Sequence, residues 1–342
     1  MARPRFELFH GQITDVAGVT VGHWTNTEAG TGCTALLVDR PAVAGMDVRG
    51  AAPGSRETEM LGPLAAIQHV NGIMLSGGSA FGLEAATGAV RFLEERGSGL
   101  KVGRAVIPIV PSAIVFDLTM ITHKVRPGAA EGYEACRVAG RTAPQGSVGA
   151  GTGATVAKLR GRSGALKGGI GTASVTLAGG FVVGALIVVN AVGGVVDPDS
   201  GEIVAGPLTA AGGFEDSVEI LINDPPRMRD WEFNTVIGVV ATNATLDRRE
   251  ATRLAGAGQD AIAQAIRPAH LSQDGDTIFA LATGEKESVH EDRLRAAATR
   301  AVVRSILNAV RAASGLGGVP AISELSKPAK APASLVRSAR AN

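Results

Sequence analysis

Cysteine is scarce in this chain. Cys33 and Cys136 are the only two among 342 residues, and they lie far apart. Such a pair forms neither a metal-binding motif nor a disulfide framework, so we expect a reducing, cytoplasmic setting and no metal site. A charge excess is lacking too, because 33 Lys and Arg residues oppose 32 Asp and Glu residues. This balance gives no basis for binding nucleic acid or a membrane surface, and we predict neither partner.

Long apolar segments are also absent. The longest, residues 181–196, is interrupted by glycines and by Asn190, and it is too short to span a bilayer. The first residues carry charges but no apolar stretch, so we expect no signal peptide. Residues 135–196 contain no Asp or Glu at all. We predict that their glycine-rich part, residues 146–171, forms a flexible, basic surface.

Glycine, by contrast, is abundant. The 46 glycines indicate many tight turns and close backbone approaches, as in a compact α/β enzyme. Residues 149–154 match the GxGxxA pattern of dinucleotide-binding loops. However, no apolar strand precedes them, and no acidic residue follows at the expected distance of about 20 residues. We therefore predict no nucleotide and no other cofactor.

Hydrophobic periodicity predicts alternating strands and helices. We expect strands within residues 12–50, at 73–75, at 106–110, and as a hairpin over 172–189 that turns at Gly179-Gly180. A helix is predicted over 81–95 with Ser79 as its N-cap, and residues 47–58 are predicted to be a loop. Residues 197–230 look like a linker. Beyond them we expect a strand at 236–242, helices at about 247–266 and 289–314, a strand at 277–282, and a disordered tail from about 323.

Several polar residues are candidates for chemistry, each with a plainer alternative. Asn190 ends a buried strand, where an amide is either a satisfied core residue or an oxyanion donor. Lys158 lies in the basic segment and is otherwise a solvated surface residue. Asp274 and Asp276 point to the same side if the chain there is extended, and they are otherwise a turn-forming pair. His270 is the histidine nearest to them in sequence.

The dipeptide Asn234-Thr235 stands where a polar segment meets an apolar, β-branched run. A threonine hydroxyl at this place can attack the preceding carbonyl, and hydrolysis of the resulting ester would make Thr235 a new N-terminus. Its α-amine, with an ordinary pKa of about 7.7–8.0, can then accept the hydroxyl proton. The dipeptide is common, so the remainder of the chain has to support this interpretation.

Seven segments together resemble the self-processing L-aminopeptidase/D-amidase-esterase family, over roughly residues 11–320. They include Asn234-Thr-Val-Ile-Gly238 and Asp274-Gly-Asp-Thr-Ile-Phe-Ala280, and the others are 11–24, 47–58, 75–83, 108–111 and 166–171. Within the family, a Thr nucleophile with an Asp-x-Asp pair is most similar to the 6-aminohexanoate-oligomer (nylon oligomer) endohydrolase branch.

The resemblance implies a four-layer α/β/β/α sandwich akin to N-terminal nucleophile hydrolases. It implies a cut into a large chain, residues 1–234, and a small chain, residues 235–342, which stay associated and assemble as a homotetramer of processed heterodimers. Thr235 would be the nucleophile, Asn190 the oxyanion donor, Lys158 a charge that lowers nearby pKa values, and Asp274 and Asp276 the orienting groups.

The implied activity is hydrolysis of linear amides, namely peptides, β-peptides or 6-aminohexanoate oligomers. Phe81 and Tyr133 are candidates for lining the substrate cleft, and each is otherwise a core residue. Three alternatives stay open. In the first, the chain is an acyltransferase of the ornithine acetyltransferase type. In the second, it is a glycine-rich binding protein that stays uncut. In the third, it is a protein nicked slowly through a succinimide at Asn234.

Overall fold

The computed structural model describes residues 7–62, 64–210, 212–225, 234–287 and 290–325. Nine of the described strands form one continuous hydrogen-bonded sheet in the order β10-β11-β14-β16-β2-β4-β7-β3, with β1 paired to β2. The strands are β1 (Val19–Asn26), β2 (Thr31–Gly50), β3 (Ser55–Arg56), β4 (His69–Ser76), β7 (Ser112–Ile114), β10 (Gly169–Leu177), β11 (Phe181–Asn190), β14 (Thr235–Ala244) and β16 (Gly275–Lys286).

The 20-residue strand β2 belongs to two halves of this sheet. Its first part, residues 31–38, pairs with β1, and its last part, residues 43–50, pairs with β16. The pairing with β4 shifts register between Leu37 and Ala42. The strand therefore leaves one sheet layer and enters a second, which places the two layers face to face.

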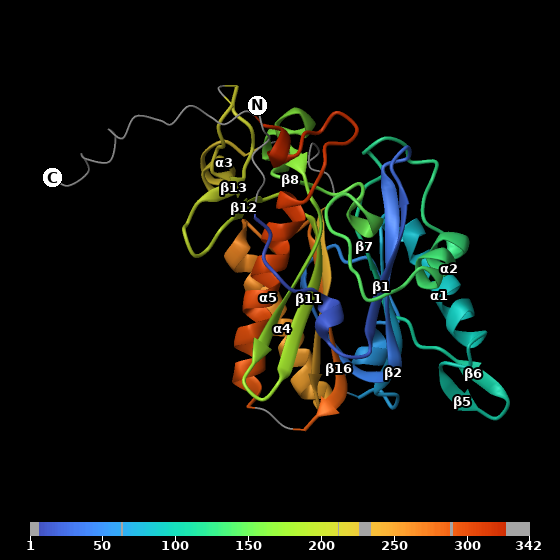
Figure 1. Ribbon diagram of the computed structural model, residues 1–342. Coiled ribbons are helices and arrows are strands. Elements are labelled where there is room, and N and C mark those ends of the chain that lie inside the picture. The colour runs from blue at the N-terminus through green and yellow to red at the C-terminus, as the bar shows by residue number, and fades with distance from the viewer. Residues whose placement is uncertain (1–6, 63, 211, 226–233, 288–289, 326–342) are drawn as a thin grey trace.

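Four layers result, and three buried apolar clusters separate them. One cluster joins α4 (Arg248–Ala265) and α5 (Glu291–Arg311) to β10, β11, β14 and β16. A second fills the space between the two sheet layers, and a third joins α1 (Ala85–Glu94) and α2 (Ala129–Arg137) to β2 and β4. Figure 1 shows these layers side by side, with α4 and α5 at one flank and α1 and α2 at the other. The predicted α/β/β/α sandwich is confirmed.

Alternation along the strands assigns side chains to the two faces of a layer. In β14, Ile237 and Val239 belong to the cluster between the sheets, while Val236 and Val240 face the helices. Thr235, two residues before Ile237, lies in register for the space between the sheets, because strand side chains repeat every second residue.

The strands after residue 234 are inserted between strands that precede it. β14 pairs antiparallel with β11 and parallel with β16, and β16 pairs antiparallel with β2. Helix α4 begins at a capping box in which Asp247 accepts the backbone N–H of Glu250 and Glu250 accepts that of Asp247. It packs across β16 and β2.

The described residues also form smaller elements. The strands are β5 (Leu100–Val102), β6 (Ala105–Ile107), β8 (Thr155–Val156), β9 (Leu166–Lys167), β12 (Gly194–Val196), β13 (Ile203–Ala205) and β15 (Ile266–Arg267), and α3 (Ser217–Asn223) is a short α-helix. Short 3-10 helices include η3 (Ser79–Glu84), η5 (Lys158–Arg160) and η8 (Ile322–Glu324). Among the described helices, none is long and apolar enough to cross a membrane.

Several local predictions are wrong. Residues 47–50 are not loop but the end of β2, because they pair with β16. Ser79 is not an N-cap. It has a left-handed φ of 53° and lies inside η3, whereas a capping residue is normally extended. The supposed linker contains β13 and α3, although residues 226–233 lie outside the described part of the chain.

The basic segment 146–171 is folded rather than a flexible surface. Lys167 is completely buried, and its ammonium donates to the carbonyl oxygens of Thr152 and Ala154. The predicted tail begins too early, because η8 covers residues 322–324. Residues 326–342 are outside the described part of the chain.

Candidate active site

Three neighbouring strands bring the predicted polar residues to one end of the sheet. Asn190 ends β11 and pairs with Thr235, the first residue of β14. Asn234 forms a parallel bridge with Asp274, which directly precedes β16. Residues far apart in sequence therefore meet because the strands that carry them are adjacent.

The peptide bond between Asn234 and Thr235 is held away from water. Asn234 is 1% exposed and Thr235 is 3% exposed. The Thr235 hydroxyl donates to the carbonyl oxygen of Asn234, in a short contact. The same oxygen accepts the backbone N–H of Gly275 at 3.2 Å. The hydroxyl thus lies beside the carbonyl group that it would attack, and a fixed backbone donor polarises that carbonyl.

Asp274 and Asp276 contact different partners. Asp276 Oδ1 accepts the N–H of Val236 at 2.7 Å, and its Oδ2 lies 2.8 Å from Nδ1 of His270. Asp274 Oδ2 accepts the N–H of Leu271 at 2.7 Å, whereas its buried Oδ1 has no hydrogen-bond partner within the described residues. Burial and the nearby charge of Asp276 raise the pKa of Asp274 above the ordinary carboxyl range.

Lys158 and Asn190 form a second polar group beside Thr235. The Lys158 ammonium donates to Oδ1 of Asn190 at 2.9 Å, and the N–H of Thr155 donates to the same oxygen at 3.0 Å. The Asn190 amide donates one of its two N–H groups to the carbonyl of Phe116 at 3.1 Å. Lys158 follows Ala157, which has a left-handed φ of 59°, and the backbone N–H of Lys158 donates to the carbonyl oxygen of Val192 at 2.9 Å. The charge of Lys158 also favours the ionised form of Asp274.

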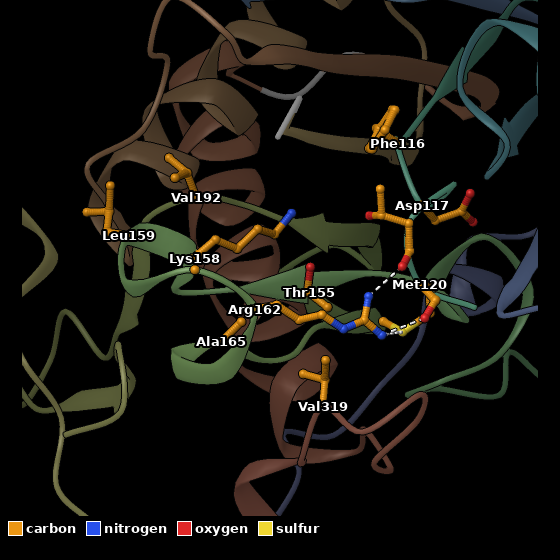
Figure 2. A pocket seen from close by; sticks show the side chains of 13 residues that line it. Phe116, Asp117, Met120, Thr155, Lys158, Leu159, Arg162, Ala165, Val192 and Val319 are labelled. Carbon is orange, nitrogen blue, oxygen red and sulfur yellow. Dashed lines mark hydrogen bonds between the residues drawn. The ribbon is translucent and has the colours of Figure 1, made fainter. Parts of the chain in front are cut away.

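A cavity of about 110 Å³ adjoins this group. Figure 2 shows the Lys158 side chain extending across it, between Val192 and Thr155. The lining also includes Phe116, Asp117, Thr119, Met120, Gly153, Leu159, Gly161, Arg162, Ala165 and Val319. Polar and apolar groups line this space in similar measure, with the Lys158 ammonium extending into it, which suits a short linear molecule that has both apolar and polar parts.

Two lining residues, Arg162 and Asp117, use their charged groups in hydrogen bonds to the surrounding protein. The Arg162 guanidinium donates to the carbonyl oxygens of Thr119, Met120 and Gly317, and so joins two loops. The Asp117 carboxylate points away from the cavity (Figure 2). It accepts the hydroxyl of Thr31 and the N–H of Gly78, both at 2.7 Å.

Phe81 and Tyr133, predicted to line a cleft, lie elsewhere. Phe81 is 58% exposed on η3, with the Arg126 guanidinium 4.1 Å from its ring centre. Tyr133 on α2 donates its hydroxyl to Glu95 and packs edge-on against another ring of the outer helical layer. Neither lines the cavity beside Lys158, because both belong to the α1 and α2 side of the fold.

Sequence reasoning missed some contacts of the site. Gly275, which lies between the two predicted aspartates, is one example, because its N–H donates to the Asn234 carbonyl oxygen. Its place directly opposite the Asn-Thr dipeptide in the parallel strand is the signal that could have found it. Thr155 and Phe116 contribute backbone groups, for which side-chain identity gives no signal. Within the described residues no group of three or more His, Cys, Asp or Glu side chains could hold a metal ion.

Comparison with known proteins agrees with this geometry. The model of peptidase family S58 matches residues 11–321. An uncharacterised aminopeptidase of Mycobacterium tuberculosis is 40% identical over 336 residues, which is 90% of this chain and 96% of that protein. A 6-aminohexanoate-oligomer endohydrolase of Paenarthrobacter ureafaciens is 30% identical over 277 residues, covering 79% of this chain and 74% of that enzyme.

Solved structures agree as well. A β-aminopeptidase of Burkholderia sp. superimposes with a TM-score of 0.67 at 25% identity, covering 92% of both chains. The L-aminopeptidase D-Ala-esterase/amidase of Ochrobactrum anthropi, described as a variant of the Ntn hydrolase fold, gives 0.69 at 22% identity, covering 92% of this chain and 90% of that one. The latter likeness concerns the fold alone. With the family match over nearly the whole chain, these results confirm the predicted family: the protein is a hydrolase of peptidase family S58.

Proposed function

We propose that the chain cuts itself between Asn234 and Thr235 and then hydrolyses small linear amides with Thr235 as its N-terminal nucleophile. The observation that carries this proposal is the buried Thr235 hydroxyl, which contacts the Asn234 carbonyl oxygen while Gly275 donates to the same atom. This arrangement supplies a nucleophile and a charge-stabilising donor at one peptide bond.

The self-cleavage step follows from these contacts. Thr235 Oγ1 attacks the Asn234 carbonyl carbon as the hydroxyl proton passes to the neighbouring Asp274 carboxylate. The C–N bond then breaks, the Thr235 nitrogen takes up a proton to become an amine, and an ester joins the two residues. Water hydrolyses the ester, which yields the Asn234 carboxylate and the free Thr235 hydroxyl. A carboxyl with a raised pKa suits this exchange, because it both accepts and returns a proton near neutral pH.

Turnover reuses the same groups. The Thr235 amine accepts the hydroxyl proton, and Oγ1 attacks the amide carbonyl of the substrate to form an acyl-enzyme and release an amine. The second N–H of the Asn190 amide is the proposed oxyanion donor, because the first is used by Phe116. Lys158 places a positive charge beside this group and so favours the developing anion. Water then hydrolyses the acyl-enzyme.

The cavity and the relatives support the proposed substrate class. A lining of mixed polar and apolar groups suits peptides, β-peptides or 6-aminohexanoate oligomers of small size. The related proteins are named as aminopeptidases and as an oligomer endohydrolase. We further propose that the large and small chains stay together, assemble as a tetramer of heterodimers, and act in the cytoplasm.

Intact-mass measurement of freshly purified, denatured protein tests the cut. We expect two fragments ending at Asn234 and beginning at Thr235 from the wild type and from Thr235→Ser, but one full-length chain from Thr235→Ala. A cut Thr235→Ala chain would instead indicate a succinimide at Asn234, and an uncut wild type would favour a binding protein.

The activity needs its own assay. We expect the cut protein to release amine from short peptides and from a 6-aminohexanoate dimer, while Thr235→Ala does not. Transfer of an acetyl group from acetyl-ornithine to glutamate, without hydrolysis of these amides, would refute the hydrolase mechanism in favour of an acyltransferase.

A further inference from the structure

His270 contacts the candidate site through both its backbone and its ring. Its N–H donates to Asp276 Oδ2 at 3.3 Å, and ring Nδ1 lies 2.8 Å from the same oxygen. Ring Nε2 faces the carbonyl oxygen of Gln259 in α4 at 3.3 Å. Both ring nitrogens therefore face acceptors, and only the imidazolium, with a hydrogen on each nitrogen, satisfies both contacts.

The backbone of His270 is shaped for this contact. Its φ of 60° is left-handed, an uncommon conformation for a residue other than glycine. The side chain is 17% exposed and Asp276 is 2% exposed. A strained backbone at a buried ion pair indicates that the surrounding structure holds the ring in one orientation.

Asp276 is fixed at both its side chain and its backbone. Its Oδ1 accepts a hydrogen bond from the N–H of Val236, which belongs to the peptide group directly after the proposed nucleophile. The completely buried Gln259 donates its amide to the carbonyl oxygens of Asp276 and Asp47, each at 2.8 Å. A chain of contacts thus runs from His270 through Asp276 to the beginning of β14.

The charges around this chain of contacts differ between the two carboxylates. Asp276 has the His270 ring against it. Asp274 is influenced by the charges of Lys158 and His270, and one of its buried oxygens has no hydrogen-bond partner in the described structure. The charge of Arg49 in β2 acts on the His270 ring, and Arg49 is itself paired with Asp260 at 3.0 Å and with Asp47 at 3.4 Å.

The balance of these effects favours the imidazolium. Burial lowers the pKa of His270 and the Arg49 charge lowers it slightly, but the hydrogen bond and charge of Asp276 outweigh them and raise it above the ordinary value. Two carboxylates with different surroundings commonly divide the acid–base work, so that one keeps its charge and the other exchanges a proton.

We propose that His270 is a positioning residue whose imidazolium holds the Asp276 carboxylate directed at Val236, which leaves Asp274 to exchange the proton with Thr235. This inference rests on the proposed self-cleavage and amide hydrolysis. It assigns His270 no contact with substrate; the ring acts through Asp276 on the position of the first residues of β14.

Replacement of His270 tests the proposal. His270→Gly removes the ring but keeps the left-handed backbone, since glycine adopts positive φ without cost. His270→Asn also tolerates this conformation and retains a hydrogen-bond donor, without a charge. We expect His270→Gly to reduce both the rate of self-cleavage and kcat by about 10- to 100-fold, a size typical of small misplacement of reacting groups, and to change KM by less than about threefold. His270→Asn should retain more activity than His270→Gly.

Two further readouts separate positioning from a general structural role. Added imidazole should restore several-fold activity to His270→Gly, because the lost ring leaves a space against Asp276. The wild-type kcat should fall as pH rises through the His270 pKa, and this alkaline decrease should be missing in His270→Asn. His290→Asn is the matched control, because His290 also lies beside a carboxylate, Asp292 at 3.8 Å, but on the surface. It should keep the wild-type rates.

The outcomes distinguish this inference from the proposed function. If the wild type remains one full-length chain, the proposed function fails and this inference fails with it. If the wild type is cut but both His270 variants are cut and turn over at its rate, with its pH profile, only the role of His270 is refuted. Should His270→Gly not fold, an unchanged pH profile in His270→Asn refutes the role by itself.

Discussion

Asp117 is a carboxylate buried at the wall of the cavity, and its replacement by asparagine is expected to stabilise the folded chain. The side chain is 3% exposed, and it accepts hydrogen bonds from Thr31 and Gly78. Asparagine can preserve both contacts. Its Oδ1 can accept the Gly78 N–H, and its amide can donate to the Thr31 hydroxyl, which is able to accept as well as donate.

The size of the effect follows from the proton affinity of the carboxyl. Burial, only partly offset by the two hydrogen bonds and the charge of Lys167, raises the pKa of Asp117 from 3.8 to about 6. Since each pKa unit corresponds to about 1.4 kcal/mol, ionised Asp117 costs the folded state about 3 kcal/mol above pH 6. Part of this is lost in the variant, because Asp117 favours the charged form of Lys167, whose pKa burial lowers to about 7. We therefore expect a net gain of about 1–2 kcal/mol at pH 7.5.

Urea unfolding at several pH values measures this gain. Asp117→Asn should be compared with its parent in the Thr235→Ala background, so that one uncut chain unfolds in both cases. The folded state binds the Asp117 proton more tightly than the unfolded state, so the parent loses stability as pH rises from about 4 to 6. The advantage of the variant should grow over that interval and then stay level until Lys167 titrates. A variant that is no more stable at pH 7.5, with a difference independent of pH, would refute the reasoning.

Two further predictions concern the site and the outer helices. Asp274→Asn should retain the contact to the Leu271 N–H and stabilise the chain at neutral pH. It should also slow self-cleavage by at least about 100-fold, because the proton acceptor is gone. Intact mass followed over time measures the rate of self-cleavage, and cleavage at the wild-type rate would contradict the prediction. Gly132→Ala should destabilise the uncut chain by about 1–3 kcal/mol, because the new Cβ would lie 1.9 Å from the carbonyl oxygen of Ala85 on the facing helix. Gly256→Ala on α4, which has more room, should be neutral or stabilising by up to about 1 kcal/mol, and an equal loss in both variants would show that packing is not the cause.

Much of the second half of the chain was predictable from its sequence. The β-branched runs of β11 and β14 are long and uninterrupted by charge, and Gly179-Gly180 marks the turn between β10 and β11. The period of α4 and α5 is equally clear. The grouping of Asn190, Asn234-Thr235 and the Asp pair in one site is implied by the resemblance to a self-processing family, and no single segment predicts it. The structure brings these residues together because the strands that carry them are adjacent.

Other features depend on tertiary contacts that no local pattern records. Residues 47–50 look like a loop but extend β2, because β16 offers them a partner. Lysine is usually a surface residue, yet the Lys167 ammonium is buried and donates to the carbonyl oxygens of Thr152 and Ala154. The left-handed turn at Ser79 and the contacts of His270 likewise arise from neighbouring strands rather than from local preference.

The position of β14 and β16 between β11 and β2 has a consequence for refolding. Before the proposed cut, all of these strands belong to one polypeptide, so their assembly is intramolecular and independent of concentration. After the cut, the middle two strands belong to a separate molecule, and recovery from denaturant becomes a second-order encounter of two partners. Dilution should then slow regain of structure in the cut protein but leave the uncut Thr235→Ala chain unaffected. In this fold, self-cleavage would convert a reversible folding equilibrium into a state protected mainly by its slow unfolding.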